Sequence, residues 1–302
     1  MQVHGPGLGA GFPGSFEDDL SGNDAITGMM QSRPAPDNGA STPDKAPSRR
    51  SDHLQSLTRG LAVLRAFSRQ HATMSVSEVA KAANISRAAA RRVLLTLEDL
   101  GYVRSEHARY SLRPKVLELG YAYLSSLYPW DYALPLMQAF SAEIDENCLA
   151  GVMDGTEVVC VARTTRKPVS VSVPVGGRLP AYASSMGRVI LANEDSEQLD
   201  AYFEKVELRA YTPQTVTDVD ELRAELTRVK EQGWSLVEHE LTTGVVGIAA
   251  PIYGPGQRVV AALNVSMHGN HEESAEHIAE IRERLLECSR ELSLLFAGST
   301  DA

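Results

Sequence analysis

A run of arginines and alanines, RAAARR from Arg87 to Arg92, has the composition of a helix that reads DNA. Small side chains let a helix backbone approach the floor of the major groove, while arginines reach guanine edges or phosphates. The positions offered to DNA are Ser86, Arg87, Ala88, Arg91 and Arg92. The alternative is an ordinary surface helix whose arginines only contact solvent.

The chain around this run has the pattern of a helix-turn-helix. Met74 to Ala83 carries apolar residues at helical spacing, and Ser75 with Glu78 forms a capping box. Residues 84–86 supply a turn and an N-cap for a second helix that ends at Leu100. The buried stripe of this recognition helix is expected at Ile85, Ala89, Val93, Leu97 and Leu100.

Two further segments would complete a winged DNA-binding domain. Tyr102 to Arg104 and Arg109 to Leu112 read as short strands that follow Gly101 and are joined by residues 105–108. Arg104 and Arg109 on this wing are expected to hold phosphates. Ahead of the helix-turn-helix, an amphipathic helix is expected to pack behind the recognition helix through Leu57, Leu61, Leu64 and Phe67.

The distribution of charge supports DNA binding, although the whole chain of 302 residues carries −10. Residues 51–113 hold ten basic and five acidic side chains, whereas residues 114–302 have a net charge of −13 and residues 1–50 one of −2. A local basic surface is enough to release counterions from DNA. The length, with 43% hydrophobic residues, suggests one small domain and one larger one.

The composition of the N-terminal residues and the spacing of the cysteines limit the class of protein further. Residues 1–50 are rich in Gly, Pro and Ser and are predicted to be disordered, with Ser48 to Arg50 forming either a basic arm or a solvated linker end. Cys148, Cys160 and Cys288 are widely separated, which predicts buried, reduced thiols. No metal or cofactor is expected, because the cysteines and histidines do not have the spacing of metal ligands. No membrane span is expected, because an apolar run of about 20 residues is missing. A cytoplasmic location is therefore expected.

The larger part of the chain has the pattern of an α+β sensor. Residues 114–128 form a linker helix that is apolar around much of its circumference, which suits contact with a partner subunit. Residues 129–302 alternate between helices and strands, with a hairpin signal at Asp154-Gly155 and glycines at Gly233 and Gly254. Helices are expected at 134–147, 184–193, 219–232 and 275–296, and strands at 148–153, 158–164, 169–173, 234–239, 248–253 and 259–267. This pattern favours a curved antiparallel sheet.

Ser184 and Ser185 open one of these helices and could bind an anion. Unpaired N–H groups and the helix dipole favour a carboxylate there, and both hydroxyls can donate to it. The alternative is a serine N-cap that serves only its own helix. Arg163 is a second candidate partner for a carboxylate, or else a surface ion pair.

Three segments resemble the IclR family of bacterial transcription regulators over residues 54–298. They are SLTRGLAVLRAF at 56–67, SVSEVAKAANISRAAARRVLLTLEDLGYV at 75–103 and GGRLPAYASSMGRVILA at 176–192. The last segment and VVAALNVS at 259–266 look like the branch that governs aromatic degradation through β-ketoadipate. That branch responds to protocatechuate, 4-hydroxybenzoate or β-ketoadipate.

The resemblance implies a winged helix-turn-helix, a linker helix and a GAF-like effector domain, assembled as a homodimer or a dimer of dimers on double-stranded operator DNA. The implied effector pocket is lined by Val171, Leu179, Ser185, Met186, Val245, Gly247, Asn264 and Ser266. Asn264 and Ser266 are two apart on one strand and face the same side. Two departures are visible: Arg113-Pro114 replaces the Leu-Gly of many members, and Val237 stands where several relatives place an acidic residue.

Two other classes of function fit the sequence less well than this regulator. An enzyme, such as a small-molecule hydrolase, is disfavoured because the segment around Ser185 lacks a Gly-x-Ser-x-Gly elbow and no phosphate-binding, dinucleotide or HExxH motif is present. An architectural DNA-binding protein without a ligand is disfavoured by the size of residues 129–302. A regulator of the same type that serves another catabolic pathway remains the main alternative.

Overall fold

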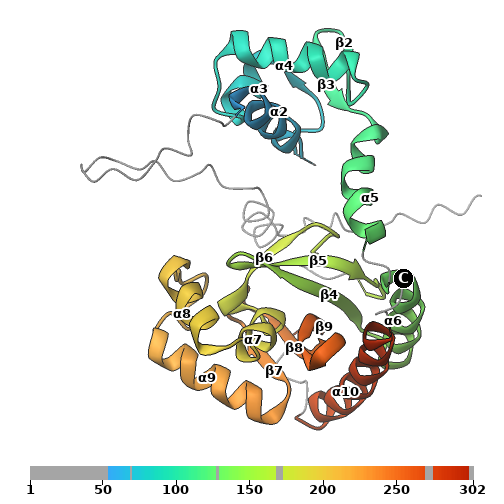
Figure 1. Ribbon diagram of the computed structural model, residues 1–302, viewed down its shortest axis with the longest axis vertical. Coiled ribbons are helices and arrows are strands. Elements are labelled where there is room, and N and C mark those ends of the chain that lie inside the picture. The colour runs from blue at the N-terminus through green and yellow to red at the C-terminus, as the bar shows by residue number, and fades with distance from the viewer. Residues whose placement is uncertain (1–53, 69, 127–128, 168–172, 269–274, 299–302) are drawn as a thin grey trace, which may run out of the picture.

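The computed structural model describes residues 54–68, 70–126, 129–167, 173–268 and 275–298 (Figure 1). The predicted tail, residues 1–50, lies outside the described residues. The N-terminal elements are α2 (Gln55–Ala66), β1 (Met74–Ser75), α3 (Val76–Ala82), α4 (Arg87–Asp99), β2 (Val103–Glu106) and β3 (Arg109–Leu112).

Local capping explains where α3 and α4 begin and end. The Ser75 hydroxyl accepts a hydrogen bond from the N–H of Glu78 at 3.3 Å, and the N–H of Ser75 donates to the Glu78 carboxylate at 2.7 Å, which confirms the predicted capping box. The hydrogen bonds from the N–H and then the hydroxyl of Ser75 hold the pKa of Glu78 below its ordinary value. Ser86 caps α4, and Gly101, with a φ of 82°, follows its C-terminal end.

The buried side of α4 differs from the expected stripe. Ala90 and Leu94 are buried together with the predicted Ala89 and Leu97, whereas Leu100 is 53% exposed. Leu100 is the C-cap residue at the end of the helix, and the chain turns away at Gly101, so helical spacing no longer predicts what packs against Leu100. The recognition helix therefore rests on the small core through a wider stripe than expected, in which the predicted Ile85 and Val93 pack only partly against the core.

The first helix also packs through a different set of residues from the one expected. Val63 is fully buried in the core with α4, and Leu64 and Phe67 pack partly against it. Leu57 and Leu61 are 60% and 48% exposed instead. Two leucines that were predicted to support the recognition helix thus lie on an open surface.

The wing is a three-stranded antiparallel sheet in the order β1-β3-β2. The predicted hairpin of β2 and β3 is confirmed, and its turn places His107 and Ala108 at positive φ values of 49° and 61°. The pairing of β1 with β3 was not expected, because residues 74 and 75 look like the start of a helix in the sequence. After the wing, the 3-10 turn η2 (Pro114–Val116) and α5 (Leu117–Ser126) lead toward the second part (Figure 1).

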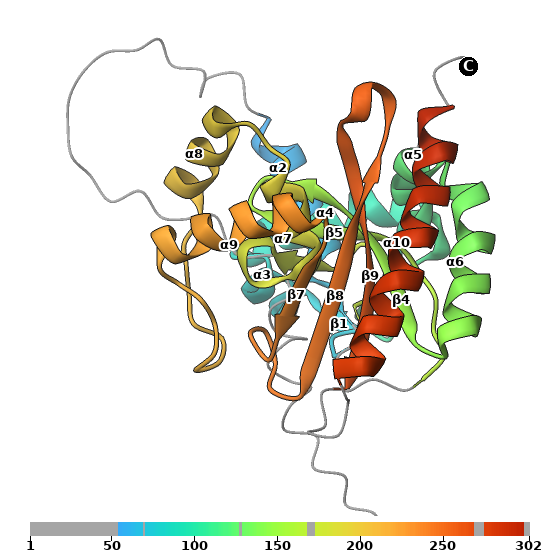
Figure 2. The same cartoon turned by 90° about the horizontal axis from the view of Figure 1, so that it is seen from below.

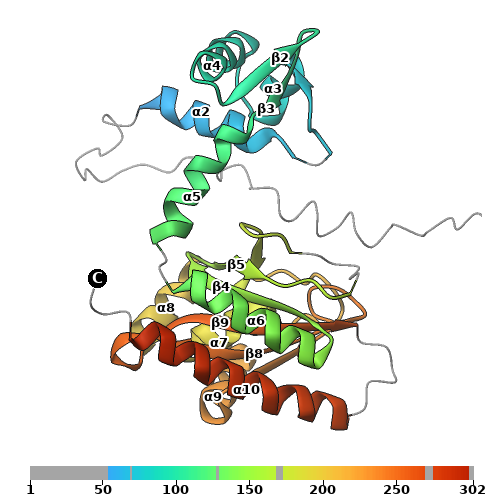
Figure 3. The same cartoon turned by 90° about the vertical axis from the view of Figure 1, so that its right-hand side faces the viewer.

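The second part is built on a six-stranded antiparallel sheet in the order β6-β5-β4-β9-β8-β7. Its strands are β4 (Asn147–Asp154), β5 (Glu157–Arg163), β6 (Arg178–Pro180), β7 (Ser235–Glu238), β8 (Val245–Tyr253) and β9 (Val259–His268). The sheet curls, as Figure 3 shows, and this agrees with the predicted α+β class and curved antiparallel sheet.

Helices cover both faces of this sheet, so the part has three layers (Figure 2). One face packs against α6 (Trp130–Ile144) and α10 (Ala275–Ala297), with Met137, Leu285 and Leu292 in the core. The other face packs against η3 (Ala181–Ala183), α7 (Ser185–Ala192) and α9 (Val219–Gln232), with α8 (Ser196–Lys205) outside them and η4 (Pro255–Gln257) joining β8 to β9. Among the described residues, no helix is long and apolar enough to span a bilayer.

Most predicted elements of this part are present, with shifted ends in α6 and in β8, which begins at Val245 instead of residue 248. α6 begins at Trp130 instead of residue 134, with Pro135 inside it, and ends where Asp145 takes a left-handed φ of 52°. β6 and α8 were not expected. The predicted strand at residues 169–173 lies mostly outside the described residues.

Candidate nucleic-acid interface and effector pocket

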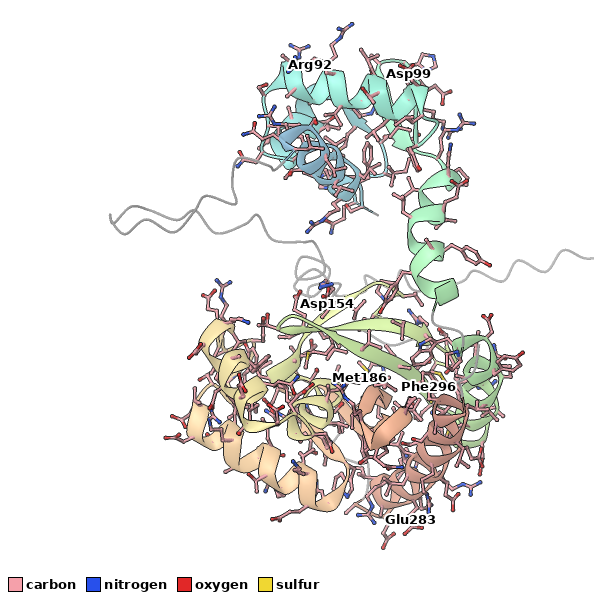
Figure 4. All side chains as sticks on the ribbon, viewed as in Figure 1. Arg92, Asp99, Asp154, Met186, Glu283 and Phe296 are labelled. Atoms are coloured by element: carbon pink, nitrogen blue, oxygen red, sulfur yellow. The ribbon has the colours of Figure 1, made fainter. Side chains whose placement is uncertain are left out.

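The first turns of α4 present an open basic surface. Arg87, Ala88, Arg91 and Arg92 are all exposed, and among the described residues no ion pair engages these three guanidinium groups. Figure 4 shows Arg92 on the outer side of α4, away from the second part of the molecule. The helix can therefore approach a DNA groove with its arginines first.

The other predicted DNA contacts already have partners within the protein. The Ser86 hydroxyl accepts from the N–H of Ala89 at 3.2 Å and serves as the N-cap. Arg104 donates from Nε to the Ser111 hydroxyl at 3.1 Å. Arg109 donates to the carbonyl of Thr73 at 2.7 Å and lies 3.4 Å from the Glu78 carboxylate, so it ties the wing to α3.

A cavity of about 80 Å³ lies between α7 and the inner face of the curled sheet. It is roughly half the volume of the 150 Å³ apolar cavity known to hold benzene. Nine of the ten predicted effector residues line it: Arg163, Leu179, Ser184, Ser185, Met186, Val245, Gly247, Asn264 and Ser266. Val171, the tenth, lies outside the described residues.

The floor of this pocket is set by the register of the strands. Leu149 on β4 pairs with both Arg163 and Asn264, so these three side chains form one row across the sheet. Asn147 and Ser266 pair two residues further along the same strands. Because alternate residues share a face, both rows face α7 and form a polar strip in an apolar wall.

The two serines at the start of α7 have separate roles. The Ser184 hydroxyl accepts from the N–H of Gly187 at 3.1 Å and caps the helix. The Ser185 hydroxyl accepts from the Asn264 amide at 2.9 Å, which joins α7 to β9 across the cavity wall. A Cβ on Gly247 would lie 3.0 Å from the Ser185 hydroxyl oxygen, so the glycine leaves room for this contact.

Arg163 supplies the cation of the pocket wall. It is half-buried and donates to the carbonyl of Val173 at 3.1 Å and to the hydroxyl of Thr165 at 2.9 Å. These bonds hold the guanidinium in the wall of the cavity. A ligand carboxylate is the chemistry that this position can accept.

A buried ion pair includes Glu240, one of the residues that line the pocket. Arg188 on α7 donates to the Glu240 carboxylate at 2.7 Å, and both side chains are less than a tenth exposed. The N–H of Val216 donates to the same carboxylate oxygen at 3.1 Å. Burial lowers the pKa of Arg188, and the Glu240 carboxylate opposes that shift.

Several lining residues were missed from the sequence: Asn147, Leu149, Thr164, Val173, Ala183, Val237, Glu240, Leu241 and Thr242. The segment HELTTG at 239–244 offered a signal, since polar residues between two strands can turn back over a sheet. Val237 does lie in the wall, and the acidic group of this region comes three residues later, from Glu240. Among the described residues no group of three His, Cys, Asp or Glu could hold a metal ion.

Known proteins match both parts of the chain. Residues 56–107 match the IclR helix-turn-helix domain, and residues 121–294 match the bacterial transcriptional regulator IclR C-terminal domain. The Pca regulon regulatory protein of Pseudomonas putida is 40% identical over 243 residues, which cover 80% of this chain and 84% of that protein.

Two solved structures have the same fold. A transcriptional regulator from Rhodococcus sp. RHA1 has a TM-score of 0.73 at 38% identity, covering 81% of this chain and 98% of that one. An IclR homolog from Microbacterium hydrocarbonoxydans, solved with 4-hydroxybenzoate, has a TM-score of 0.72 at 26% identity and covers 81% of this chain and all of that one. The family predicted from the sequence is confirmed: this chain belongs to the IclR family of bacterial transcriptional regulators, DNA-binding proteins and not enzymes.

Proposed function

We propose that this regulator controls genes of aromatic-compound catabolism and responds to a small organic acid. One observation carries the proposal: the chain combines an open arginine surface on α4 with a separate pocket that holds one cation, Arg163, in a largely apolar wall. The likeness to the Pca regulon regulatory protein and to a homolog that binds 4-hydroxybenzoate supports this class of ligand. Acting on a bacterial chromosome, the protein would work in the cytoplasm.

On DNA, Arg87, Ala88, Arg91 and Arg92 are proposed to read or flank base edges. Ser86 would place the N-terminus of α4 against the phosphate backbone of the DNA. Arg104 would hold a phosphate, and Arg109 could do so only by giving up its contacts with Thr73 and Glu78. The four residues of α4 are thus the centre of the proposed interface.

In the pocket, Arg163 and the donors at the start of α7 are proposed to bind the carboxylate of the effector. Leu179, Met186 and Val245, with Val171, would contact its apolar part, and Asn264 and Ser266 its polar groups. Because the cavity is smaller than one that holds benzene, we propose that its walls move when a benzoic acid binds. That movement is the signal we propose to reach the DNA-reading part through α5.

We propose that the protein acts as a homodimer or a pair of dimers. Exposed apolar side chains lie on two elements, with Leu57 and Leu61 on α2 and Leu117 and Tyr121 on α5 at 48 to 74% exposure. Such a face, placed beside a DNA-reading helix, suits a second copy that brings its own α4 to the next half of a two-fold operator.

Fluorescence anisotropy of labelled upstream DNA tests the proposal. The protein is titrated at two salt concentrations, without ligand and with protocatechuate, 4-hydroxybenzoate or β-ketoadipate. Tight, salt-sensitive binding that one acid changes is expected. DNA binding that none of the three acids changes would indicate that the regulator serves another catabolic pathway. Absence of specific binding would overturn the proposed DNA interface.

Arg91→Ala probes the reading surface itself. Loss of a guanine contact should weaken operator binding by about 1–3 kcal/mol. Lys230→Ala removes the same charge from the exposed side of α9 and should leave the affinity unchanged. Equal affinity of the Arg91 variant and the wild type would remove this arginine from the interface.

A further inference from the structure

The hydroxyl of Thr242 is a buried polar group without a hydrogen-bond partner among the described residues. Thr242 lies in the wall of the effector pocket, on the segment between β7 and β8. Buried hydroxyl groups in folded proteins are nearly always hydrogen-bonded, because the loss of water is otherwise uncompensated. An unpaired hydroxyl beside a cavity therefore points to a group that a ligand supplies.

The loop that carries Thr242 is held firmly on both sides. The N–H of His239 donates to the carbonyl of Val245 at 2.8 Å, and the N–H of Gly244 donates to the His239 ring at 3.0 Å. The hydroxyl of Thr215 donates to the carbonyl of Glu240 at 2.6 Å. Since the backbone around it is fixed, the missing partner of Thr242 reflects its position and not a loose loop.

The groups around Thr242 bear on the kind of ligand group that can bind there. Glu240, two residues away, also lines the cavity, and its carboxylate is paired with Arg188 and accepts from the N–H of Val216. Among the described residues that line the cavity Arg163 is the one cation, so the Thr242 side has no cation for a second ligand carboxylate, whereas a ligand hydroxyl can donate to the Thr242 hydroxyl or accept from it. The cation of the pocket, Arg163, lies on β5, with β4, β9 and β8 between that strand and β7.

We propose that Thr242 binds a hydroxyl group of the effector, so that the pocket selects a hydroxylated acid with a single carboxylate over a dicarboxylate. The inference rests on the effector site proposed above. Thr242 lines the cavity and its hydroxyl oxygen is buried, and a step of χ1 to another staggered rotamer can bring Oγ1 to the place that Cγ2 now occupies. The ligand hydroxyl would then pair with Thr242 while its carboxylate pairs with Arg163.

Isothermal titration of the full-length protein with 4-hydroxybenzoate, benzoate and adipate tests this assignment. Benzoate lacks only the hydroxyl, and adipate replaces the ring and hydroxyl by a chain with a second carboxylate. The wild type should bind 4-hydroxybenzoate at least about tenfold more tightly than benzoate, which corresponds to about 1.4 kcal/mol. Adipate should bind more weakly than 4-hydroxybenzoate.

Thr242→Val keeps the shape of the side chain and removes the hydroxyl. It should reduce the preference for 4-hydroxybenzoate over benzoate to about onefold while leaving the affinity for benzoate unchanged. Thr242→Ser should retain the preference, and Thr243→Val, at the exposed neighbouring position, should behave as the wild type.

Different failures overturn different parts of the argument. A preference that survives Thr242→Val, or tighter binding of adipate, would overturn the role of Thr242 while keeping the effector site. If Arg163→Ala leaves the affinity of every acid unchanged, or none of them binds the wild type, the proposed effector site fails and this inference fails with it.

Discussion

Gly187 is the residue that allows α7 to lie against the turn before it. A Cβ at this position would lie 2.2 Å from the carbonyl oxygen of Ala181 and 2.3 Å from its Cα. Both atoms belong to the backbone, so a neighbouring side chain cannot relieve the overlap by turning away. The position of Ser185 and Met186 over the pocket therefore depends on the absence of one methyl group.

We expect Gly187→Ala to destabilise the protein by about 1–3 kcal/mol, as overpacking of a close contact does. Thermal unfolding followed by circular dichroism should show a lower midpoint, by roughly 2–4 °C for each kcal/mol. Gly120→Ala on α5 is the matched control, because a Cβ there meets nothing within 4 Å. An unchanged midpoint for Gly187→Ala would mean that η3 and α7 can separate freely.

The three cysteines are buried, as the sequence predicted, and they are free thiols. Burial raises the pKa of Cys148 and Cys288 to about 12 and that of Cys160 to about 11, from an ordinary value of 9.0. Because these pKa values are higher in the folded state, the neutral thiols favour folding below pH 9. Their contribution is lost as the pH rises toward 11 and 12.

A thiol reagent added to the native protein at pH 8 should therefore react slowly with all three cysteines. The reactive thiolate is scarce at that pH, and each side chain is out of contact with solvent. Absorbance of the released chromophore should rise only when urea unfolds the protein. Fast labelling of one cysteine in the native state would contradict the burial of that thiol.

At the scale of elements, α2 has two different faces. Val63 is buried against the helix-turn-helix, whereas Leu57 and Leu61, one turn apart, are exposed. Apolar side chains at i and i+4 form a continuous stripe on a helix. Such an exposed stripe is the expected contact for a second copy of the chain.

We expect Leu57→Glu with Leu61→Glu to shift the protein toward the monomer and to weaken operator binding. Two carboxylates in an apolar interface would have to be desolvated without partners. Sedimentation velocity measures the oligomeric state, and circular dichroism checks the fold. Arg59→Glu is a useful control on the same helix, since Arg59 donates a hydrogen bond to Gln55 of its own helix. A variant that remains a dimer would exclude this stripe as the interface.

At the scale of the whole molecule, the DNA-reading surface and the pocket belong to separate cores. The helix-turn-helix core is formed by residues 63–110, and the pocket lies beside a core formed by residues 149–262. Figure 1 shows α5 as the element that leads from one part to the other. Any influence of a ligand on DNA binding therefore has to pass through this helix or through a partner copy.

Thermodynamic linkage makes this coupling measurable from both ends. If an acid changes operator affinity by a given factor, operator DNA has to change the affinity for that acid by the same factor, typically 5- to 150-fold. Anisotropy gives the first factor and titration of the protein–DNA complex with the acid gives the second. Ser185→Leu should abolish both while DNA binding persists, and loss of DNA binding as well would indicate a folding defect.

The sequence by itself determined the features that arise from neighbouring residues. The capping box of Ser75 and Glu78, a serine N-cap for α7 at Ser184 or Ser185, the glycine ends of α4 and α9 and the hairpin at residues 154–157 all depend on contacts a few residues apart. Motifs of this kind also carried the resemblance to the family. Local chemistry was sufficient for them because each contact is closed within one turn of the chain.

Only the tertiary structure decided which distant residues form the pocket. Arg188 and Glu240 are 52 residues apart and Ser185 and Asn264 are 79 apart, and no local pattern links the members of either pair. The order of the strands brings them together, since the register of β4, β5 and β9 places Arg163 and Asn264 in one row. The sequence also could not show that the Thr242 hydroxyl is unpaired. A missing hydrogen-bond partner can be recognised only when all the surrounding groups are in their folded positions.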